Sequence, residues 1–251
     1  MIKFAKGLAI ETYLLLKTCP TLYKINKKRN DYTQQDIHNV INNFCKESLR
    51  LNGQNITIHG VENIPKEACL FVSNHRSMID GMIMPSVIEK PLSMIIAKEP
   101  QYENIPIVNK WTKLSKCLYI DRENNRNALK TISKASDLIN KGISVGAFPE
   151  GHLTDENDIL DNFKDGLFRI ATKAQCPVVP IAIEGSEKSY IVDKSLIPLV
   201  NDANIDVYIL KPVKEHIGIP RFKTTELSNI VRNKILEKIH IHRKNKTAIT
   251  K

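Results

Sequence analysis

A histidine and an aspartate five positions apart are the first residues in the chain whose types could do acid–base chemistry. They are His75 and Asp80, in the segment N-H-R-S-M-I-D that follows a short apolar run. A carboxylate bonded to an imidazole fixes its tautomer and stabilises the imidazolium, so His75 could act as a general base. Five positions turn through about 140° on a helix, so the pair requires a loop or an early turn. The same spacing also fits a histidine and an aspartate that have only a structural role.

Two further groups of polar residues also follow apolar runs. Arg122 ends the segment C-L-Y-I-D-R, and its guanidinium is a permanent cation with a planar fork that suits phosphate. The loop F-P-E-G-H contains Glu150, Gly151 and His152, where proline fixes the backbone and glycine permits a close approach to a substrate. Taken singly, these segments also fit a surface salt bridge and a plain turn.

The order of these segments is more informative than any one of them. N-H-x-x-x-x-D, I-D-R, F-P-E-G and V-V-P-I resemble the four sequence blocks of the glycerolipid acyltransferase family, most closely its bacterial 1-acyl-sn-glycerol-3-phosphate acyltransferases. The segments I-I-A-K-E and F-K-D-G between the blocks add to the resemblance, which covers residues 55 to 215.

The resemblance implies acyl transfer from a thioester, either acyl-CoA or acyl carrier protein, to the sn-2 hydroxyl of a lysophospholipid, giving phosphatidic acid without a metal or other cofactor. His75 and Asp80 are then the catalytic residues. Val179, Pro180 and Ile181 are expected to shape the floor of the pocket or the path of the acyl chain. The residues expected to bind the acceptor are Lys98, Arg122, Glu150, Gly151 and His152.

One departure from the family pattern bears on the acceptor. After F-P-E-G the family usually has Thr-Arg, whereas this chain has His152 and Leu153. A phosphate-binding guanidinium is therefore missing from that position. Either His152 replaces it when protonated, or the acceptor is another lysophospholipid or an acyl-amino-acid lipid.

The elements that must position these residues follow from the apolar pattern. Short apolar runs alternate with helical stretches, which predicts an α/β fold with a mixed sheet flanked by helices. Ligand groups in such sheets gather where strands give way to loops. A C-terminal helix followed by a basic tail is expected over residues 223–246. Strands are expected within residues 56–58, 69–75, 93–99, 117–122, 143–151, 178–185 and 205–213.

A helical hairpin over residues 1–50 is expected to precede the α/β domain of residues 51–251. Its first helix is predicted over residues 2–18, ending before Pro20, and its second over residues 35–51. Lysines gather on one side of the first helix, which fits either an interfacial membrane helix or a helix packed on its own domain. The family resemblance favours the membrane, with the protein peripheral or monotopic at the cytoplasmic face of the cell membrane.

Composition narrows the classes of partner. The 251 residues include 37 Lys and Arg against 27 Asp and Glu, a net charge of +10 that favours an anionic partner. Aromatic residues make up 6% and no nucleic-acid-binding motif is present, so nucleic acid is not expected, although a basic nucleic-acid-binding or non-catalytic lipid-binding protein remains an alternative. The five cysteines include no C-x-x-C pair, which argues against a disulfide framework and a zinc site.

Overall fold

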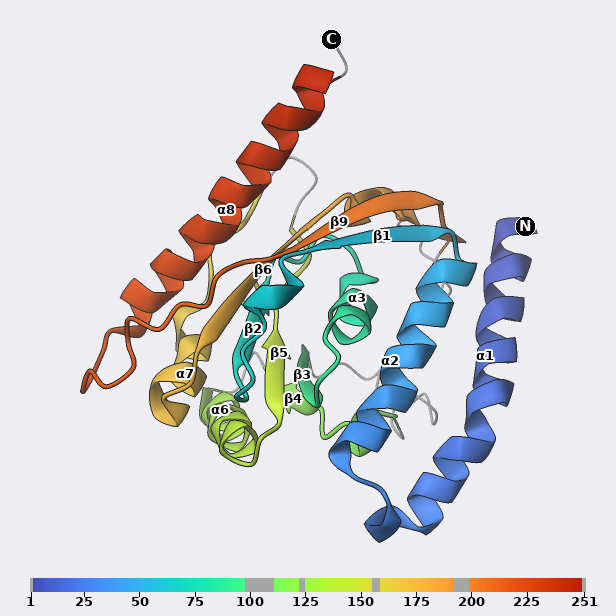
Figure 1. The fold of residues 1–251 in the computed structure, drawn as a ribbon, viewed down its shortest axis with the longest axis horizontal. Coiled ribbons are helices and arrows are strands. Elements are labelled where there is room, and N and C mark those ends of the chain that lie inside the picture. The colour runs from blue at the N-terminus through green and yellow to red at the C-terminus, as the bar shows by residue number, and fades with distance from the viewer. Residues whose placement is uncertain (1, 98–110, 122–124, 155–158, 192–198, 250–251) are drawn as a thin grey trace.

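Seven strands of this computed structural model form one sheet in the order β1-β9-β6-β2-β5-β3-β4 (Figure 1). Neighbouring strands pair in parallel except β6 and β9, which are antiparallel, so the prediction of a mixed sheet is confirmed. The structure describes residues 2–97, 111–121, 125–154, 159–191 and 199–249. The strands of the sheet are β1 (Gln54–His59), β2 (Leu70–Ser73), β3 (Leu92–Ala97), β4 (Leu118–Ile120), β5 (Ser144–Ala147), β6 (Val178–Glu184) and β9 (Ala203–Ile209).

Helices cover both faces of the sheet and make a three-layer core. Along β2, Leu70 and Val72 pack into the cluster under α6, α7 and α8, whereas Phe71 packs into the cluster under α3 on the opposite face. Side chains buried on both faces explain why the strands appear as continuous apolar runs in the sequence. The covering helices are α3 (Asp80–Val87), α6 (Asn125–Asn140), α7 (Arg169–Ala174) and α8 (Thr224–Ile249).

Several short elements also lie in the described ranges. β7 and β8 form a separate antiparallel pair. These short elements are η1 (Arg29–Asp31), η2 (Val61–Asn63), η3 (Asp165–Phe168), η4 (Ser186–Lys188), β7 (Tyr190–Ile191) and β8 (Leu199–Val200).

The first helix, α1 (Ile2–Lys27), continues through Pro20, so the prediction that it ends before this proline is wrong. A proline inside a helix costs about 3 kcal/mol because it lacks an N–H and crowds the preceding turn. Beyond Pro20, Leu22 and Ile25 are buried in the cluster shared with the second helix. Burial of two such side chains contributes about 1.5–3 kcal/mol each, which offsets the proline.

The second helix, α2 (Gln34–Leu51), agrees with the prediction within one residue and docks the hairpin onto the sheet domain. Thr33 caps it: its hydroxyl accepts from the Asp36 N–H at 3.1 Å, and the Asp36 carboxylate accepts from the Thr33 N–H at 2.8 Å. On the facing side, Asn42 Nδ2 donates to the Pro85 carbonyl at 2.8 Å at the end of α3. The division into two domains near residue 50 stays a prediction.

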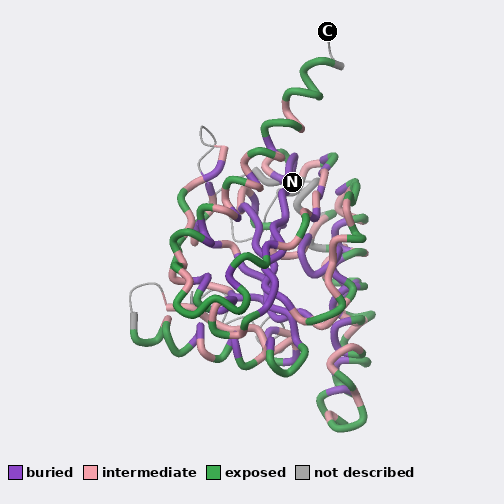
Figure 2. Tube along the Cα trace, turned by 60° about the vertical axis from the view of Figure 1, so that its left-hand side comes forward, coloured by how far each residue is buried: buried purple, intermediate pink, exposed green. Residues whose placement is uncertain are grey.

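The last helix, α8, includes the segment predicted to be a basic tail, which is therefore helical as far as Ile249. Its C-terminal turns extend away from the body of the molecule, and residues 244–248 are exposed (Figures 1 and 2). Where the helix leaves the body of the molecule, Arg243 donates two hydrogen bonds to Glu184 at the end of β6. They run from Nε to Oε2 at 2.8 Å and from Nη2 to Oε1 at 3.0 Å.

Two buried histidines predict how stability depends on pH. His38 Nε2 lies 2.6 Å from the Ile88 carbonyl and His216 Nε2 lies 2.9 Å from the Cys176 carbonyl, and burial lowers the pKa of both side chains. As the pH falls through about 6.5, these two histidines become protonated in the unfolded chain but stay neutral in the folded chain. We therefore expect the free energy of unfolding in urea to be lower at pH 5.5 than at pH 7.5.

A double variant, His38→Gln with His216→Gln, provides the control, because the glutamine amide can donate to both carbonyls and does not titrate. Its free energy of unfolding should change less between the two pH values than that of the unaltered chain. An equal change in both proteins would contradict the assignment to these histidines.

Candidate active site

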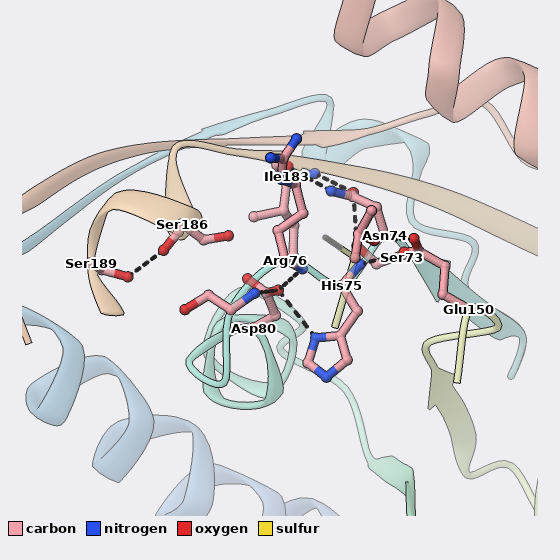
Figure 3. A network of polar contacts seen from close by, with 11 residues as sticks. Ser73, Asn74, His75, Arg76, Asp80, Glu150, Ile183, Ser186 and Ser189 are labelled. Atoms are coloured by element: carbon pink, nitrogen blue, oxygen red, sulfur yellow. Dashed lines mark hydrogen bonds and ion pairs between the residues drawn. The ribbon is translucent and has the colours of Figure 1, made fainter. Parts of the chain in front are cut away.

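His75 and Asp80 meet across a tight turn between β2 and α3. The strand ends at Ser73 and the helix begins at Asp80, so His75 Nδ1 lies 3.2 Å from Asp80 Oδ2 (Figure 3). The same oxygen accepts the backbone N–H groups of Arg76 and Ser77, each at 2.8 Å. Asp80 is wholly buried, whereas 18% of the His75 side chain is exposed. The structure thus holds a carboxylate in place behind an accessible imidazole.

The tautomer of His75 follows from this contact. When the Asp80 carboxylate is ionised and the imidazole is neutral, the carboxylate can only accept, so Nδ1 carries the proton and Nε2 keeps its lone pair. Nε2 points away from the network of polar contacts around Asp80 (Figure 3). A ring in this state can take a proton at Nε2, and the carboxylate behind it stabilises the resulting imidazolium.

Asn74 ties the end of β2 to β6. Its Nδ2 donates to the Ile183 carbonyl and its Oδ1 accepts the Ile183 N–H, both at 2.8 Å, and the side chain is wholly buried. The amide therefore reproduces a backbone pair one residue before His75. No role for Asn74 was predicted, although it stands directly before the histidine in the first block.

The loop of residues 148–154 holds His75 from a second side. The Phe148 ring is stacked on the imidazole, with centroids 4.2 Å apart and planes 17° apart. The His75 N–H donates to Glu150 Oε1 at 2.7 Å, and the His75 carbonyl accepts the Thr154 N–H at 2.8 Å. Both backbone groups and one ring face of His75 are therefore fixed by this loop. Phe148 and Thr154 were not assigned these roles from sequence, although both lie in or beside the third block.

Glu150 faces inward. Its second oxygen, Oε2, accepts the Asp161 N–H at 2.9 Å and the Thr154 hydroxyl, and no part of the residue is exposed. Because protein donors occupy both carboxylate oxygens, a contact between Glu150 and a substrate is left to its backbone. The carboxylate itself acts on the loop that contains His75.

Gly151 and His152 lie at the outer side of the same loop. Gly151 has a φ of +78°, and a Cβ there would lie 3.0 Å from Lys164 Nζ, so any larger residue would be strained. His152 Nε2 is 2.7 Å from Asp161 Oδ2. Hydrogen bonds from the Asn162 N–H and from His152 hold the pKa of Asp161 below its usual value. A protonated His152 therefore already has a carboxylate partner.

The remaining predicted residues are placed less completely. Lys98 and Arg122 lie outside the described residues, so their binding roles stay predictions. The strands before them are neighbours, since Ala97 of β3 pairs with Ile120 of β4. Val179 and Ile181 are wholly buried in the core under α3, and their contribution to a pocket floor or an acyl path stays a prediction.

Comparison with known proteins gives these residues a context. The family model described as "Acyltransferase" matches residues 55–184. A "Probable 1-acyl-sn-glycerol-3-phosphate acyltransferase" of Mycoplasma pneumoniae is 33% identical over 146 residues, which cover 55% of this chain and 52% of the relative. A 1-acyl-sn-glycerol-3-phosphate acyltransferase of Borreliella burgdorferi is 27% identical over 196 residues, covering 77% and 75%. The match thus spans about half of the first relative and three quarters of the second.

A solved structure supports the same fold. The 1-acyl-sn-glycerophosphate acyltransferase PlsC from Thermotoga maritima aligns with a TM-score of 0.75 over 95% of both chains, at 20% sequence identity. The family model matches more than half of this chain and includes the histidine, the aspartate and the loop that holds them. The chain therefore belongs to the acyltransferase family.

Proposed function

We propose that this enzyme transfers a fatty acyl chain from an acyl thioester to the sn-2 hydroxyl of 1-acyl-sn-glycerol-3-phosphate, making phosphatidic acid for phospholipid synthesis. The observation that carries the proposal is the His75–Asp80 pair, whose free Nε2 lies at the end of a strand in a member of this family. The relatives' names supply the acceptor. The thioester, as acyl-CoA or acyl carrier protein, is a co-substrate, and the proposal includes no metal or other cofactor.

The geometry suits the chemistry of this reaction. A neutral alcohol is a weak nucleophile, so its proton must leave as the oxygen attacks the thioester carbonyl. His75 Nε2 takes this proton, and Asp80 stabilises the imidazolium while the N–H groups of Arg76 and Ser77 hold its charge in place. The intermediate then collapses: the new C–O bond remains, the C–S bond breaks, and His75 returns the proton to the departing thiolate.

We also propose that α1 lies against the cytoplasmic face of the cell membrane. Where the burial of its side chains is described, the exposed large hydrophobic residues of α1 are Tyr13, Leu16 and Tyr23, at 56%, 70% and 60% exposure. Their spacing places them on one side of the helix, and the exposed lysines Lys24 and Lys27 share this side. Apolar and aromatic side chains among cations suit an anionic interface. No helix in the described ranges has the length and apolar character needed to cross a bilayer.

Removing the apolar side chains of this face should weaken membrane binding. We expect Tyr13→Ser, Leu16→Ser and Tyr23→Ser together to lower co-sedimentation with phosphatidylglycerol vesicles by about tenfold or more, because each side chain contributes on the order of 1 kcal/mol or more by leaving water. A control with Leu129→Ser and Ile219→Ser, exposed at 49% and 48% elsewhere, should bind normally. Unchanged binding of the triple variant, or equal loss in the control, would exclude this face.

An acyl-transfer assay tests the proposed reaction. Purified protein, palmitoyl-CoA or palmitoyl carrier protein, and a panel of lysophospholipids in vesicles should yield phosphatidic acid from lysophosphatidic acid. Transfer only to another lysophospholipid or to an acyl-amino-acid lipid would assign the alternative acceptor, for which the His152 and Leu153 departure is the favouring observation. Lipid binding without transfer to any acceptor would leave a non-catalytic lipid-binding protein.

A further inference from the structure

We infer that Lys164 binds the phosphate group of the lysophospholipid acceptor. The inference rests on the proposed function and names a residue for its acceptor specificity. Lys164 comes ten residues after Thr154, in the segment F-K-D-G just before η3. It lies outside the motifs from which the binding residues were predicted.

The Lys164 side chain lies against the loop of residues 148–154. Its stem lies flat over Gly151, with Nζ, Cε and Cδ at 3.0, 3.1 and 3.4 Å from the place that a Cβ would take. Its backbone is tied to the same loop, because the Lys164 N–H donates to the Pro149 carbonyl at 2.9 Å. The ammonium group is therefore held beside the loop that fixes both backbone groups of His75.

The other charged side chains at this loop already have partners within the protein. His152 has Asp161 as its partner at 2.7 Å. The buried Glu150 carboxylate is occupied by protein donors. Across the described ranges, no carboxylate lies within ion-pair distance of Lys164 Nζ. The exposed ammonium of Lys164 is thus a cation at this loop that still has its charge and three donors to offer.

The proposed acceptor has a phosphate group close to its reacting hydroxyl. A phosphate monoester carries nearly two negative charges at neutral pH, and in the acceptor it is only a few bonds from the hydroxyl that reacts. The cation that binds it must therefore lie close to the base. Lys164 lies against Gly151, the residue that follows Glu150, and the Glu150 carboxylate accepts the His75 N–H. Leu153, next to His152, brings no charge to this task.

A substitution that removes only the charge tests the inference. For Lys164→Met we expect the KM for lysophosphatidic acid to rise about tenfold or more, the size of one hydrogen bond to a charged group. The kcat at saturation and the KM for palmitoyl-CoA should stay unchanged, because the lost contact is made in both ground and transition states. Lys164→Arg should keep the KM near its original value. Transfer to monoacylglycerol, which has no phosphate, should not respond to Lys164→Met.

A matched control is Lys141→Met, which removes one exposed lysine from the turn after α6. Its kinetics should equal those of the unaltered enzyme. The inference is overturned by an unchanged KM for lysophosphatidic acid in Lys164→Met. It is also overturned by a rise confined to the KM for palmitoyl-CoA, which would assign the lysine to phosphates of the donor, or by an equal loss of kcat with both acceptors, which would assign it to loop structure.

Direct binding separates this inference from the proposed reaction. Titration calorimetry with lysophosphatidic acid should give weaker binding to Lys164→Met than to the unaltered enzyme or to Lys141→Met. If that difference is found in a protein that transfers no acyl chain to this lipid, the binding role stands and the proposed reaction fails. Equal binding to all three proteins overturns the role of Lys164 even where transfer is observed.

Discussion

Replacement of His75 by glutamine is expected to lower the kcat of acyl transfer by about 10²- to 10⁴-fold, the usual contribution of a general base. Glutamine keeps the backbone contacts to Glu150 and Thr154 but cannot take the proton that Nε2 takes. Asp80→Asn should lower kcat in the same direction, because a neutral amide does not stabilise the imidazolium. Initial rates at saturating donor and acceptor measure both effects.

The control for this prediction is His59→Gln. His59 is an exposed histidine on β1 that also contacts a carboxylate, Asp206, at 3.0 Å. Its replacement should leave kcat unaltered, and the thermal midpoint of His75→Gln should stay near that of the unaltered enzyme. A His75→Gln enzyme that keeps more than a tenth of its kcat would refute the assignment of the base.

Glu150→Ala is expected to lower the free energy of unfolding by about 3 kcal/mol or more. It leaves the buried Thr154 hydroxyl and the partly buried His75 and Asp161 N–H groups without their acceptor, at roughly 1–3 kcal/mol for each such group. Activity should fall as well, because the backbone of the base is released. Urea unfolding at pH 7.5, with kcat measured below the transition, follows both quantities.

Two control variants test whether the loss of stability in Glu150→Ala comes from the buried carboxylate. Glu150→Gln keeps the shape and one carbonyl acceptor, so its loss of stability should lie between those of the unaltered chain and Glu150→Ala. Glu67→Ala removes a half-exposed glutamate that contacts Lys214 at 3.3 Å, and its effect should stay within about 0.5 kcal/mol. Equal stability of Glu150→Ala and Glu67→Ala would mean that the buried carboxylate contributes nothing.

The sequence predicts those elements whose residues decide the outcome locally. The central strands β2, β5 and β6 could be predicted because both of their faces are buried, and α2 could be predicted because its apolar residues recur at helical spacing. The end of α1 could not be predicted. It depends on Leu22 and Ile25 packing against another helix, an effect that no local propensity contains.

The same distinction holds within the site. His75 and Asp80 are five residues apart, so their pairing could be predicted on the condition of a loop or an early turn between them. The direction of the Glu150 side chain was not accessible, because its partner His75 lies 75 residues earlier. Lys164 belongs to the F-K-D-G segment that adds to the family resemblance, but its position could not be predicted, because it lies against Gly151, a residue without a side chain.

The groups around His75 are far apart in the sequence, so they are synthesised at different times and their contacts form in a fixed order. During synthesis, the histidine and the aspartate leave the ribosome together, long before the Glu150 that holds the histidine's N–H and the Ile183 that holds its neighbour Asn74. Contacts that close such long stretches of chain form slowly, because the entropy of loop closure is lost before they are made. A nascent chain therefore contains His75 and Asp80 well before the contacts around His75 can be completed, because the last of these contacts needs nearly three quarters of the chain.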